Sequence, residues 1–478
     1  MIARSLVVVA LVACGDSPTD PVAVLEDPAT CGGCHSQHYM EWSGSMHAYA
    51  SEDPVFVAMN NRGERETYGL LGNFCLQCHA PMAVALGLVD GSNGPFDPTQ
   101  LPPPARGVTC YFCHDVAEVQ ADHDNGLKLA MDTTMRGGVS DPVESSAHHS
   151  KYDPELMASA TNGSKMCGSC HDVVTQRGVP LERTYVEWQS TIFAQLPAGA
   201  GGITCSGCHM GTNVDPATTM IVDKPGVRGK SRPDSFHEHL WPGIDQSMTP
   251  FAGVDAAAAQ AAGIARDLDP ALTIVGPAKS GGQIGEGGIC VTHDGRITVR
   301  MDSRGPGHDW PSGAAHDRRA WLEVIAYDAA GDVVFSSGDV PDDLDPEQLD
   351  DPDLVGLWER ALGEDGTPAH FIWDVASVSS ILLAPPITLD RNVAAFDHSM
   401  TASFPIGTML AANIDHISAR VRVRPYPHAV LDDLVASGDL DSTIAANLGT
   451  LDIAGADRHW TAADVDPASD GCDRDPYQ

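Results

Sequence analysis

Short runs of alternating apolar and polar residues dominate the second half of the chain. Turns rich in Gly, Pro and Asp separate these runs, which read "GRITVRMD", "RAWLEVIAYDA", "GDVVFSSG", "MTASFPIG" and "ISARVRVRPY". A period of two places successive side chains on opposite faces of a strand, so that one face can be buried. The pattern predicts an antiparallel β-sandwich over residues 271–430, followed by a helical or irregular tail over residues 431–478.

The first half of the chain lacks such a period. The segment from His35 to His47 has a helical composition, and the run "DAAAAQAAGIARDL" predicts a helical connector over residues 250–270. The rest of residues 30–249 is too rich in Gly and Pro to build a dense apolar interior from side chains alone. We therefore predict an α+β, multidomain protein whose first domain is mostly helical or irregular, with little regular secondary structure.

The N-terminus has the pattern of an export signal. An apolar run from Leu6 to Ala13 follows one arginine and is too short to span a bilayer, which predicts a signal peptide over residues 1–13. The run ends in small residues and Cys14, like a bacterial lipoprotein cleavage site, where the cysteine becomes the lipid anchor. In the alternative, the signal peptide is an ordinary one and the cysteine is incidental.

Residues 14–29 then form a flexible tether. A glycine, and not an aspartate, follows the cysteine, which favours the outer membrane by resemblance to bacterial sorting rules. The expected product is an exported protein that is periplasmic or anchored to the outer membrane.

Ten of the thirteen cysteines fall into five copies of one motif, two cysteines three positions apart followed by a histidine. Chance would give on the order of a hundredth of one such match in this chain. The copies are Cys31, Cys34 and His35; Cys75, Cys78 and His79; Cys110, Cys113 and His114; Cys167, Cys170 and His171; and Cys205, Cys208 and His209. At this spacing both thiols lie on one side of a helical turn and can bond to the two vinyl groups of one haem, while the histidine ligates its iron.

Two other uses of paired cysteines fit less well. A tetrahedral zinc site takes two such pairs, whereas five is an odd number, and zinc gives no reason for a histidine after every pair. A thioredoxin-like redox site needs one motif and not five. The sequence therefore predicts five covalently bound haems c, which supply much of the interior of the first domain.

Each haem iron has a second axial position, and its occupant separates electron transfer from catalysis. In a helix, the twelve residues from His35 to His47 span about 18 Å, so His47 cannot reach its own haem. It either binds a different haem or is a surface histidine. Two histidine pairs are further candidates, with one member of each expected to be solvated: His148 with His149, and His237 with His239. His123 is a weaker candidate, and Met210 cannot reach the far face of the haem bound by His209.

The first domain contains an internal sequence repeat. "YMEWSGSMH" at residues 39–47 and "YVEWQSTIF" at residues 185–193 share Tyr, Glu and Trp at equal spacing, each downstream of a "CG-x-CH" motif. Where the first segment has His47, the second has Phe193. Either one iron lacks an obvious ligand, or that ligand comes from elsewhere in the chain.

The second half contains one notable cluster, "GPGHDWPSGAAHDRRAWLEV". His308 is a candidate ligand donated across the domain interface, and Arg318 and Arg319 are candidates for neutralising haem propionates. The alternative is a turn with exposed polar residues. The remaining cysteines, Cys290 and Cys472, either pair in a disulfide bond or stay as free thiols.

The chain is strongly acidic, with 28 Lys and Arg against 65 Asp and Glu and a formal net charge of −37. This charge makes nucleic acid and anionic lipid head groups poor partners. Either the acidic residues form a solvated surface suited to high salt, or they attract a basic redox partner protein.

Residues 30–245 resemble the exported multihaem cytochromes c related to the tetrahaem electron carrier that serves hydroxylamine oxidoreductase. The matching stretches are "CGGCH…YMEWSGSMHA", "NFCLQCHAPM", "GVTCYFCH", "SSAHHSKY…CGSCHDV", "TYVEWQS…GITCSGCHM" and "SFHEHLWPG". The family implies stacked haems, mostly with two histidine ligands, that pass electrons along a chain. Carried over, the resemblance favours His47, His148 and His239 as distal iron ligands. The fifth motif and the large sandwich depart from the tetrahaem pattern.

The sequence predicts an electron carrier of the bacterial cell envelope, attached to the membrane by its lipid anchor. Five haems would relay single electrons between redox partner proteins, and no residue is expected to be catalytic. One alternative is an oxidoreductase with one open haem iron that acts on a small nitrogen or sulfur species. Another is a structural or adhesive surface module with haems as a scaffold. The carrier is favoured because enough histidines are available to close every iron.

Overall fold

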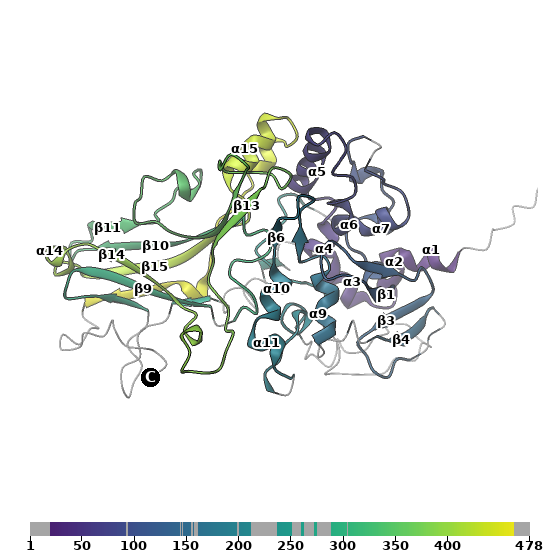
Figure 1. Cartoon of the computed structure of the whole chain (residues 1–478), viewed down its shortest axis with the longest axis horizontal. Coiled ribbons are helices and arrows are strands. Elements are labelled where there is room, and N and C mark those ends of the chain that lie inside the picture. Colours follow the sequence, from purple (N-terminus) through teal and green to yellow (C-terminus); the bar gives the residue numbers. More distant parts are fainter. Residues whose placement is uncertain are drawn as a thin grey trace, which may run out of the picture.

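The computed structural model describes residues 20–462 apart from residues 92–93, 144, 146, 154–155, 157–160, 198–199, 212–236, 251–259, 262–271, 275–287 and 304. The predicted signal peptide, Cys14, Cys472 and most of the predicted Ala-rich connector lie outside these residues. The first half of the chain forms a helical domain and the second half forms a β domain beside it (Figure 1). Cys290 is disulfide-bonded.

Short helices joined by long loops make up the first domain, which we call the haem-motif domain. Its helices are α1 (Pro21–Glu26), α2 (Pro28–Gly32), α3 (Ser36–Ser43), α4 (Met46–Tyr49), α5 (Pro54–Glu66), α6 (Leu76–His79), α7 (Pro81–Ala85), α8 (Cys110–His114), α9 (Thr161–Gly168), α10 (Thr184–Gln189), α11 (Ile192–Gln195) and α12 (Cys205–His209). Its strands pair in three two-stranded ladders: β1 (Val116–Val119) with β2 (Leu127–Leu129), β3 (Thr134–Gly137) with β4 (His149–Tyr152), and β5 (Val173–Val174) with β6 (Pro180–Glu182).

Local sequence explains where these helices begin and end. The predicted helical segment 35–47 is divided into α3 and α4 at Gly44, and Ser45 caps α4 by accepting a hydrogen bond from the Ala48 amide (3.3 Å). Helix α5 begins with Pro54 after Asp53, whose carboxylate accepts from the Val55 amide (2.9 Å). Short capped helices of this kind suit a domain that is interrupted by large cofactors.

The β domain is built from two antiparallel sheets. One contains β10 (Arg319–Tyr327), β11 (Val333–Ser337), β12 (Val355–Leu362), β13 (Ser377–Ile381), β15 (His416–Arg424), β16 (Leu451–Asp452) and β17 (Arg458–Thr461), and the other contains β7 (Leu272–Ile274), β8 (Ile289–Val291), β9 (Arg296–Ser303) and β14 (Met400–Pro405). Each of the five alternating runs in the sequence lies in one of these strands. The prediction of a mixed α and β chain with several antiparallel sheets is confirmed.

The two sheets of the β domain share one apolar core. Ile297 and Val299 of β9 and Phe404 of β14 belong to the same buried cluster as Leu322 of β10 and Val421 of β15. Strand β10 lies in the middle of the larger sheet, between β12 and β15. The alternation of the sequence therefore places one face of each central strand in this core.

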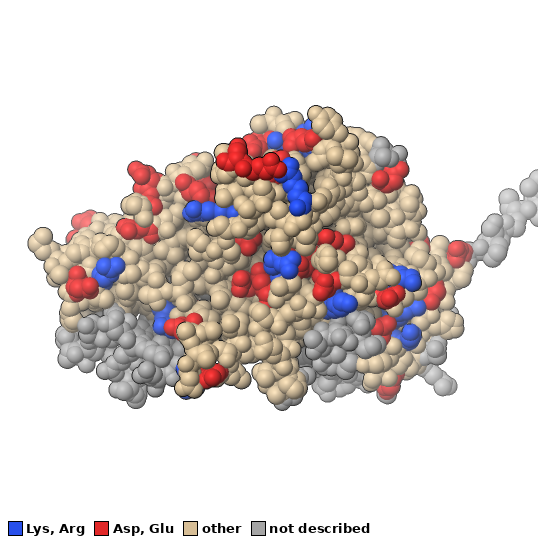
Figure 2. Space-filling view, viewed as in Figure 1, with Lys and Arg blue, Asp and Glu red and all other residues tan. Residues whose placement is uncertain are grey.

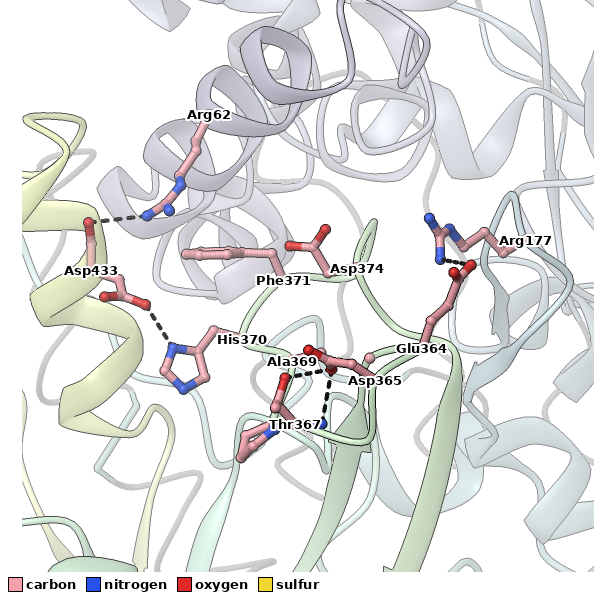
Figure 3. Close-up of a pocket in the computed structure, with 12 residues that line it drawn as sticks. Arg62, Arg177, Glu364, Asp365, Thr367, Ala369, His370, Phe371, Asp374 and Asp433 are labelled. Atoms are coloured by element: carbon pink, nitrogen blue, oxygen red, sulfur yellow. Dashed lines mark hydrogen bonds and ion pairs between the residues drawn. The ribbon is translucent and has the colours of Figure 1, made fainter.

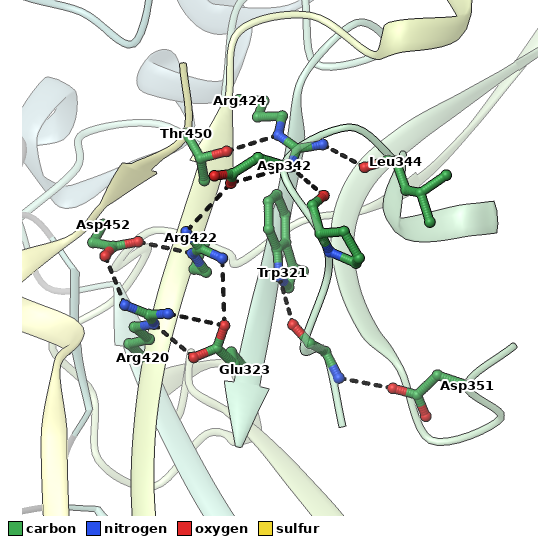
Figure 4. A network of polar contacts seen from close by, with 12 residues as sticks. Trp321, Glu323, Asp342, Leu344, Asp351, Arg420, Arg422, Arg424, Thr450 and Asp452 are labelled. Atoms are coloured by element: carbon green, nitrogen blue, oxygen red, sulfur yellow. Dashed lines mark hydrogen bonds and ion pairs between the residues drawn. The ribbon is translucent and has the colours of Figure 1, made fainter. Parts of the chain in front are cut away.

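The opposite face of β10 carries a polar network around a buried tryptophan (Figure 4). The Trp321 indole nitrogen donates to the Gly338 carbonyl (2.9 Å), and the Arg424 guanidinium lies 5.2 Å from the centre of the Trp321 ring. Glu323 is also buried and accepts from Arg420 at 2.7 Å and from Arg422 at 3.4 Å. Buried carboxylates need such pairing, because the desolvation of an unpaired charge is costly.

Replacing Trp321 by alanine is expected to lower the free energy of unfolding of the β domain by about 3–5 kcal/mol, because a fully buried aromatic side chain leaves a cavity. Trp321 is 0% exposed. The matched control is Val333→Ala on the neighbouring strand β11, where the side chain is 58% exposed and a change within about 0.5 kcal/mol is expected. Urea denaturation of both variants tests this, and equal midpoints would contradict the assigned role of Trp321.

The two domains meet along helix α5 and a helix of the second half, α15 (His428–Ala436). Val55 of α5 packs in one cluster with Leu431 and Leu434 of α15. Around this apolar contact lies a pocket of about 560 Å³ (Figure 3). Arg62 lies over the Phe371 ring at 4.1 Å in this pocket and donates to a main-chain carbonyl of α15 (3.0 Å).

The C-terminal region differs from the prediction of a helical or irregular tail over residues 431–478. Its described part contains the helical segments α15, α16 (Ser442–Ala445) and η7 (Ala454–Ala456), but also β16 and β17, which pair with β15 of the large sheet. The two strands are two and four residues long. Runs this short do not display a period of two, which is why the sequence pattern missed them.

Candidate haem sites

Each of the five motifs lies on or beside a helical turn. The third and fifth motifs form α8 and α12, and Thr109 and Thr204 cap these helices by accepting from the amides of Phe112 (3.3 Å) and Gly207 (3.1 Å). In the other three motifs the histidine amide donates to the carbonyl of the first cysteine, at 2.7 Å (His35), 3.1 Å (His79) and 3.0 Å (His171). This helical hydrogen bond, from the amide of the fifth residue of a motif to the carbonyl of the first, brings both thiols and the histidine to one side of the turn, as haem attachment requires.

Thiols of different motifs lie in contact with one another. Cys31 contacts Cys110, Cys78 contacts Cys170, and Cys167 contacts Cys205. All ten motif cysteines are free of disulfide bonds. The motifs are therefore neighbours in space as first with third, second with fourth, and fourth with fifth.

Four of the five motif histidines face a second histidine ring. The pairs, with the distances between ring centres, are His35 and His148 (6.4 Å), His47 and His171 (6.1 Å), His114 and His239 (6.3 Å), and His209 and His308 (6.2 Å). A metal ion bonded at about 2 Å to a nitrogen of each of two facing imidazoles separates their ring centres by about 6 Å. The spacing thus fits an iron between the two rings of each pair.

The hydrogen bonds of these histidines fit the same arrangement. A ring nitrogen, Nδ1, donates to a main-chain carbonyl in five of the paired histidines: His114 (Arg136, 2.6 Å), His148 (His149, 3.0 Å), His209 (Pro242, 3.0 Å), His239 (His237, 2.9 Å) and His308 (Asp309, 2.8 Å). Nδ1 of the second-motif histidine, His79, donates to the Ala50 carbonyl in the same way (3.3 Å). A histidine held in this way has its other nitrogen, Nε2, deprotonated and available to a metal ion.

Burial keeps these rings neutral. Burial, followed by the nearby histidines, lowers the pKa of His47 to about 3 and the pKa values of His35 and His171 to about 4. Neutral imidazole is the form that ligates a metal ion, so the ring charge does not oppose iron binding at neutral pH.

The structure separates the candidate ligands that the sequence suggested. His47, His148 and His239 each face a motif histidine, and His47 faces that of the fourth motif and not that of its own. His149 is an exposed residue of β4, and His123 pairs with the neighbouring Asp122 (3.1 Å). Sequence reasoning left His308 open and did not consider His38, whose ring lies 4.6 Å from that of His239.

His79 of the second motif differs from the other four. Its ring stacks on Phe56 at 4.0 Å with an angle of 4° between the planes, which is a packing contact and not the geometry of an axial pair. Within the described parts of the chain, no histidine ring contacts that of His79. The expectation that histidines close every iron is therefore not met at this motif by the described residues.

The two arginines proposed for haem propionates occupy different environments. Arg318 is buried, donates to Asp245 (2.7 Å) and to the Pro425 carbonyl (2.9 Å), and leaves its Nε without a hydrogen-bond partner. Arg319 instead pairs with Glu347 within the β domain. Only Arg318 presents a buried unused donor of the kind that a propionate would accept.

Comparisons with known proteins indicate the class of protein that this chain resembles. A family model described as cytochrome c554 and c-prime matches residues 30–115, which contain the first three motifs. No curated protein matches the chain. The crystal structure of a penta-heme cytochrome c552 from Thermochromatium tepidum has a similar fold, with a TM-score of 0.55 and 17% sequence identity, over 91% of this chain and 98% of that chain. These findings support a multihaem cytochrome c.

The fold similarity covers most of both chains, so the β domain is part of the shared fold and not an isolated addition. The family-model match is confined to the haem-motif domain. Haem binding through cysteine pairs therefore has support from sequence, geometry and comparison together.

A glycine inside the fourth motif tests the packing around a candidate haem site. A Cβ atom at Gly168 would lie 2.4 Å from the Tyr185 ring, whereas one at Gly137 on β3 would have no heavy atom within 4 Å. We expect Gly168→Ala to lower the free energy of unfolding by about 1–3 kcal/mol, since overpacking outweighs the helix propensity of alanine. Thermal unfolding followed by haem absorbance measures this against Gly137→Ala. Equal midpoint temperatures of the two variants would contradict the close packing of Tyr185 against Gly168.

Proposed function

We propose that this chain binds five haems c at its five motifs and transfers single electrons along them. The observation that carries the proposal is the set of four facing histidine pairs, spaced 6.1–6.4 Å between ring centres. A haem iron with two histidine ligands exchanges electrons but has no position for a substrate. In this proposal His35, His79, His114, His171 and His209 are proximal ligands, and His47, His148 and His239 are distal ligands.

The contacts between thiols suggest the order of the sites. They connect the first motif to the third, the second to the fourth and the fourth to the fifth. Cys113 of the third motif also lies near Cys170 of the fourth. We propose a path that runs through motifs one, three, four and five, with the second motif as a branch beside the fourth.

The place of the protein in the cell is part of the proposal. The apolar N-terminal run and Cys14 support an exported lipoprotein in the periplasm or on the outer membrane. Within the described residues, no helix has the length and apolar character needed to cross a bilayer. Acidic side chains spread over both domains on the face in Figure 2, which suits a basic redox partner protein.

A second candidate function rests on His79. An iron ligated only by this histidine would be open to a small nitrogen or sulfur species, as an oxidoreductase requires. Burial lowers the pKa of His79, and the hydrogen bond to the Ala50 carbonyl, followed by nearby Asp245, partly opposes this shift. An acidic group therefore lies close to the motif. One oxygen of Asp245, Oδ2, accepts from Arg318, and the other, Oδ1, is buried without a hydrogen-bond partner. This geometry favours an oxidoreductase function at the iron of the second motif. The four irons with facing histidine pairs keep their proposed role in electron transfer.

Reoxidation of the reduced holoprotein separates the two candidates. A carrier is expected to pass its electrons to an electron-accepting dye at a rate that carbon monoxide leaves unchanged, and to react slowly with nitrite, hydroxylamine and tetrathionate. An oxidoreductase is expected to turn over one of these compounds and to be inhibited by carbon monoxide. Rapid turnover that His79→Ala alone abolishes would reject the carrier as the main function.

A further inference from the structure

The sequence repeat of residues 39–47 and 185–193 is also a structural repeat. In each copy the tyrosine ring packs against the glycine of the preceding motif, where a Cβ atom would lie 2.8 Å (Gly32) or 2.4 Å (Gly168) from it. Tyr39 and Trp42 have their ring centres 5.8 Å apart, and the distance between Tyr185 and Trp188 is the same. The first and fourth motifs thus share one local architecture.

Each copy of the repeat connects to a second motif in the same way. The Trp42 indole nitrogen donates to the Val108 carbonyl (2.7 Å), and that of Trp188 donates to the Ile203 carbonyl (3.0 Å). Both carbonyls lie two residues before the first cysteine of a motif. The first cysteines of the joined motifs are in contact as well, as described above. The chain therefore contains two equivalent pairs of sites, first with third and fourth with fifth.

The glutamate of each copy holds a loop that carries a histidine. Glu41 accepts a hydrogen bond from the amide of His239 (3.0 Å), and the His239 ring faces that of His114 at 6.3 Å. Glu187 accepts from the amide of Asp309 (3.2 Å), and the adjacent His308 ring faces that of His209 at 6.2 Å. The planes of the second pair are 14° apart and those of the first are 26° apart.

We propose that His308, donated by the β domain, is the distal ligand of the haem at Cys205 and Cys208, with Glu187 as a positioning residue. In this inference, which rests on the proposed function, His308 takes the place in the second pair of sites that His239 takes in the first. The β domain then completes a haem site, and the iron of the fifth motif bonds to both domains.

The loop that carries His308 is fixed by contacts other than the iron. Ser312 donates to Glu187 (2.6 Å), and the Gly313 amide donates to Thr184 at the start of α10 (3.0 Å). Behind the histidine, the amide and carbonyl of Trp310 pair with those of Leu383 in the β domain, both at 2.9 Å. The loop thus holds the His308 ring opposite His209, as a preorganised ligand requires.

The close approach of the loop also requires a small residue before His308. A Cβ atom at Gly307 would lie 3.3 Å from the Trp188 ring and 3.4 Å from the Phe193 ring. Phe193 stands in the repeat where the first copy has His47. The aromatic residue that replaces a histidine in the second copy therefore packs against the loop that carries His308.

The experiment is electron paramagnetic resonance of the full holoprotein with carbon monoxide titration of its reduced form. In His308→Ala we expect one low-spin iron per chain to become high-spin and the number of carbon monoxide sites to rise by one. The control His416→Ala removes a histidine of the β domain that stacks on Tyr327 at 4.5 Å and faces no motif, and it should leave the spectrum unchanged. An unchanged number of low-spin irons and of carbon monoxide sites in His308→Ala would overturn the inference.

Three further variants keep the test decisive if His308→Ala is unstable. His308→Met is expected to keep that iron low-spin but to replace its histidine signature by a methionine-to-iron charge-transfer band, and an unchanged spectrum would contradict the proposal. Glu187→Gln should alter the signal of the fifth haem alone, whereas Glu41→Gln should alter that of the third. Wild-type protein without haem at Cys205 would reject the proposed function at this site, whereas normal haem content with no effect of these variants rejects only the ligand assignment.

Discussion

Protein produced without covalent haem is expected to lose the fold of the haem-motif domain and to keep that of the β domain. In the described residues, the largest apolar cluster lies between the two sheets of the β domain, and the clusters of the haem-motif domain are small and separate. When a cofactor provides the interior, binding and folding share one free energy.

Limited proteolysis of the full chain, made in hosts with and without cytochrome maturation, measures this effect. The expected haem-free product is cut throughout residues 20–211 and protected over most of residues 288–462, whereas the mature product resists cleavage in both regions. Circular dichroism should show a loss of helical signal with retention of strand signal. Equal resistance of residues 20–211 in the two products would contradict a haem-supported core.

Replacing His47 by alanine is expected to open the iron of the fourth motif. The main chain at His47 is fixed, because its carbonyl accepts from the Val108 amide (2.8 Å) and because Gly107, at φ +63°, packs against it. The His47 ring is thereby held 6.1 Å from that of His171. In the proposed arrangement a segment next to the first motif supplies a ligand to the fourth, so its loss is expected to affect a site in the middle of the proposed path.

We expect His47→Ala to convert one low-spin iron to high-spin, to add one carbon monoxide site and to slow electron transfer from the first motif to the fifth. His123→Ala is the matched control, since His123 is exposed and faces Asp122. Potentiometry should show one changed potential in His47→Ala and none in the control. Identical spin states in wild-type and His47→Ala protein would show that another group closes this iron.

Local chemistry explains which parts of the protein the sequence could predict. Two cysteines and a histidine within five residues need only one helical turn to form a haem site, so the motif itself contains the geometry. The alternating runs predicted strands for a similar reason, because each strand buries one face. Helix length alone excluded His47 from its own haem, and the structure places that residue opposite His171.

Long-range pairing explains what the sequence left undecided. His308 lies in a different domain from the fifth motif, and no spacing rule connects it to His209. A signal was present nonetheless, since Glu187 of the second repeat corresponds to Glu41 of the first. Glu41 accepts from the His239 amide, and Glu187 accepts in the same way from the Asp309 amide beside His308. The strands β16 and β17 were missed because they are too short to show a period.

The most direct test of the account combines intact mass spectrometry with electron paramagnetic resonance of the purified native protein. We predict the mass of the polypeptide plus five haems, four low-spin irons with two histidine ligands, and one high-spin iron at the second motif. A mass equal to that of the bare polypeptide, or irons without nitrogen ligands on both faces at the four paired sites, would contradict it.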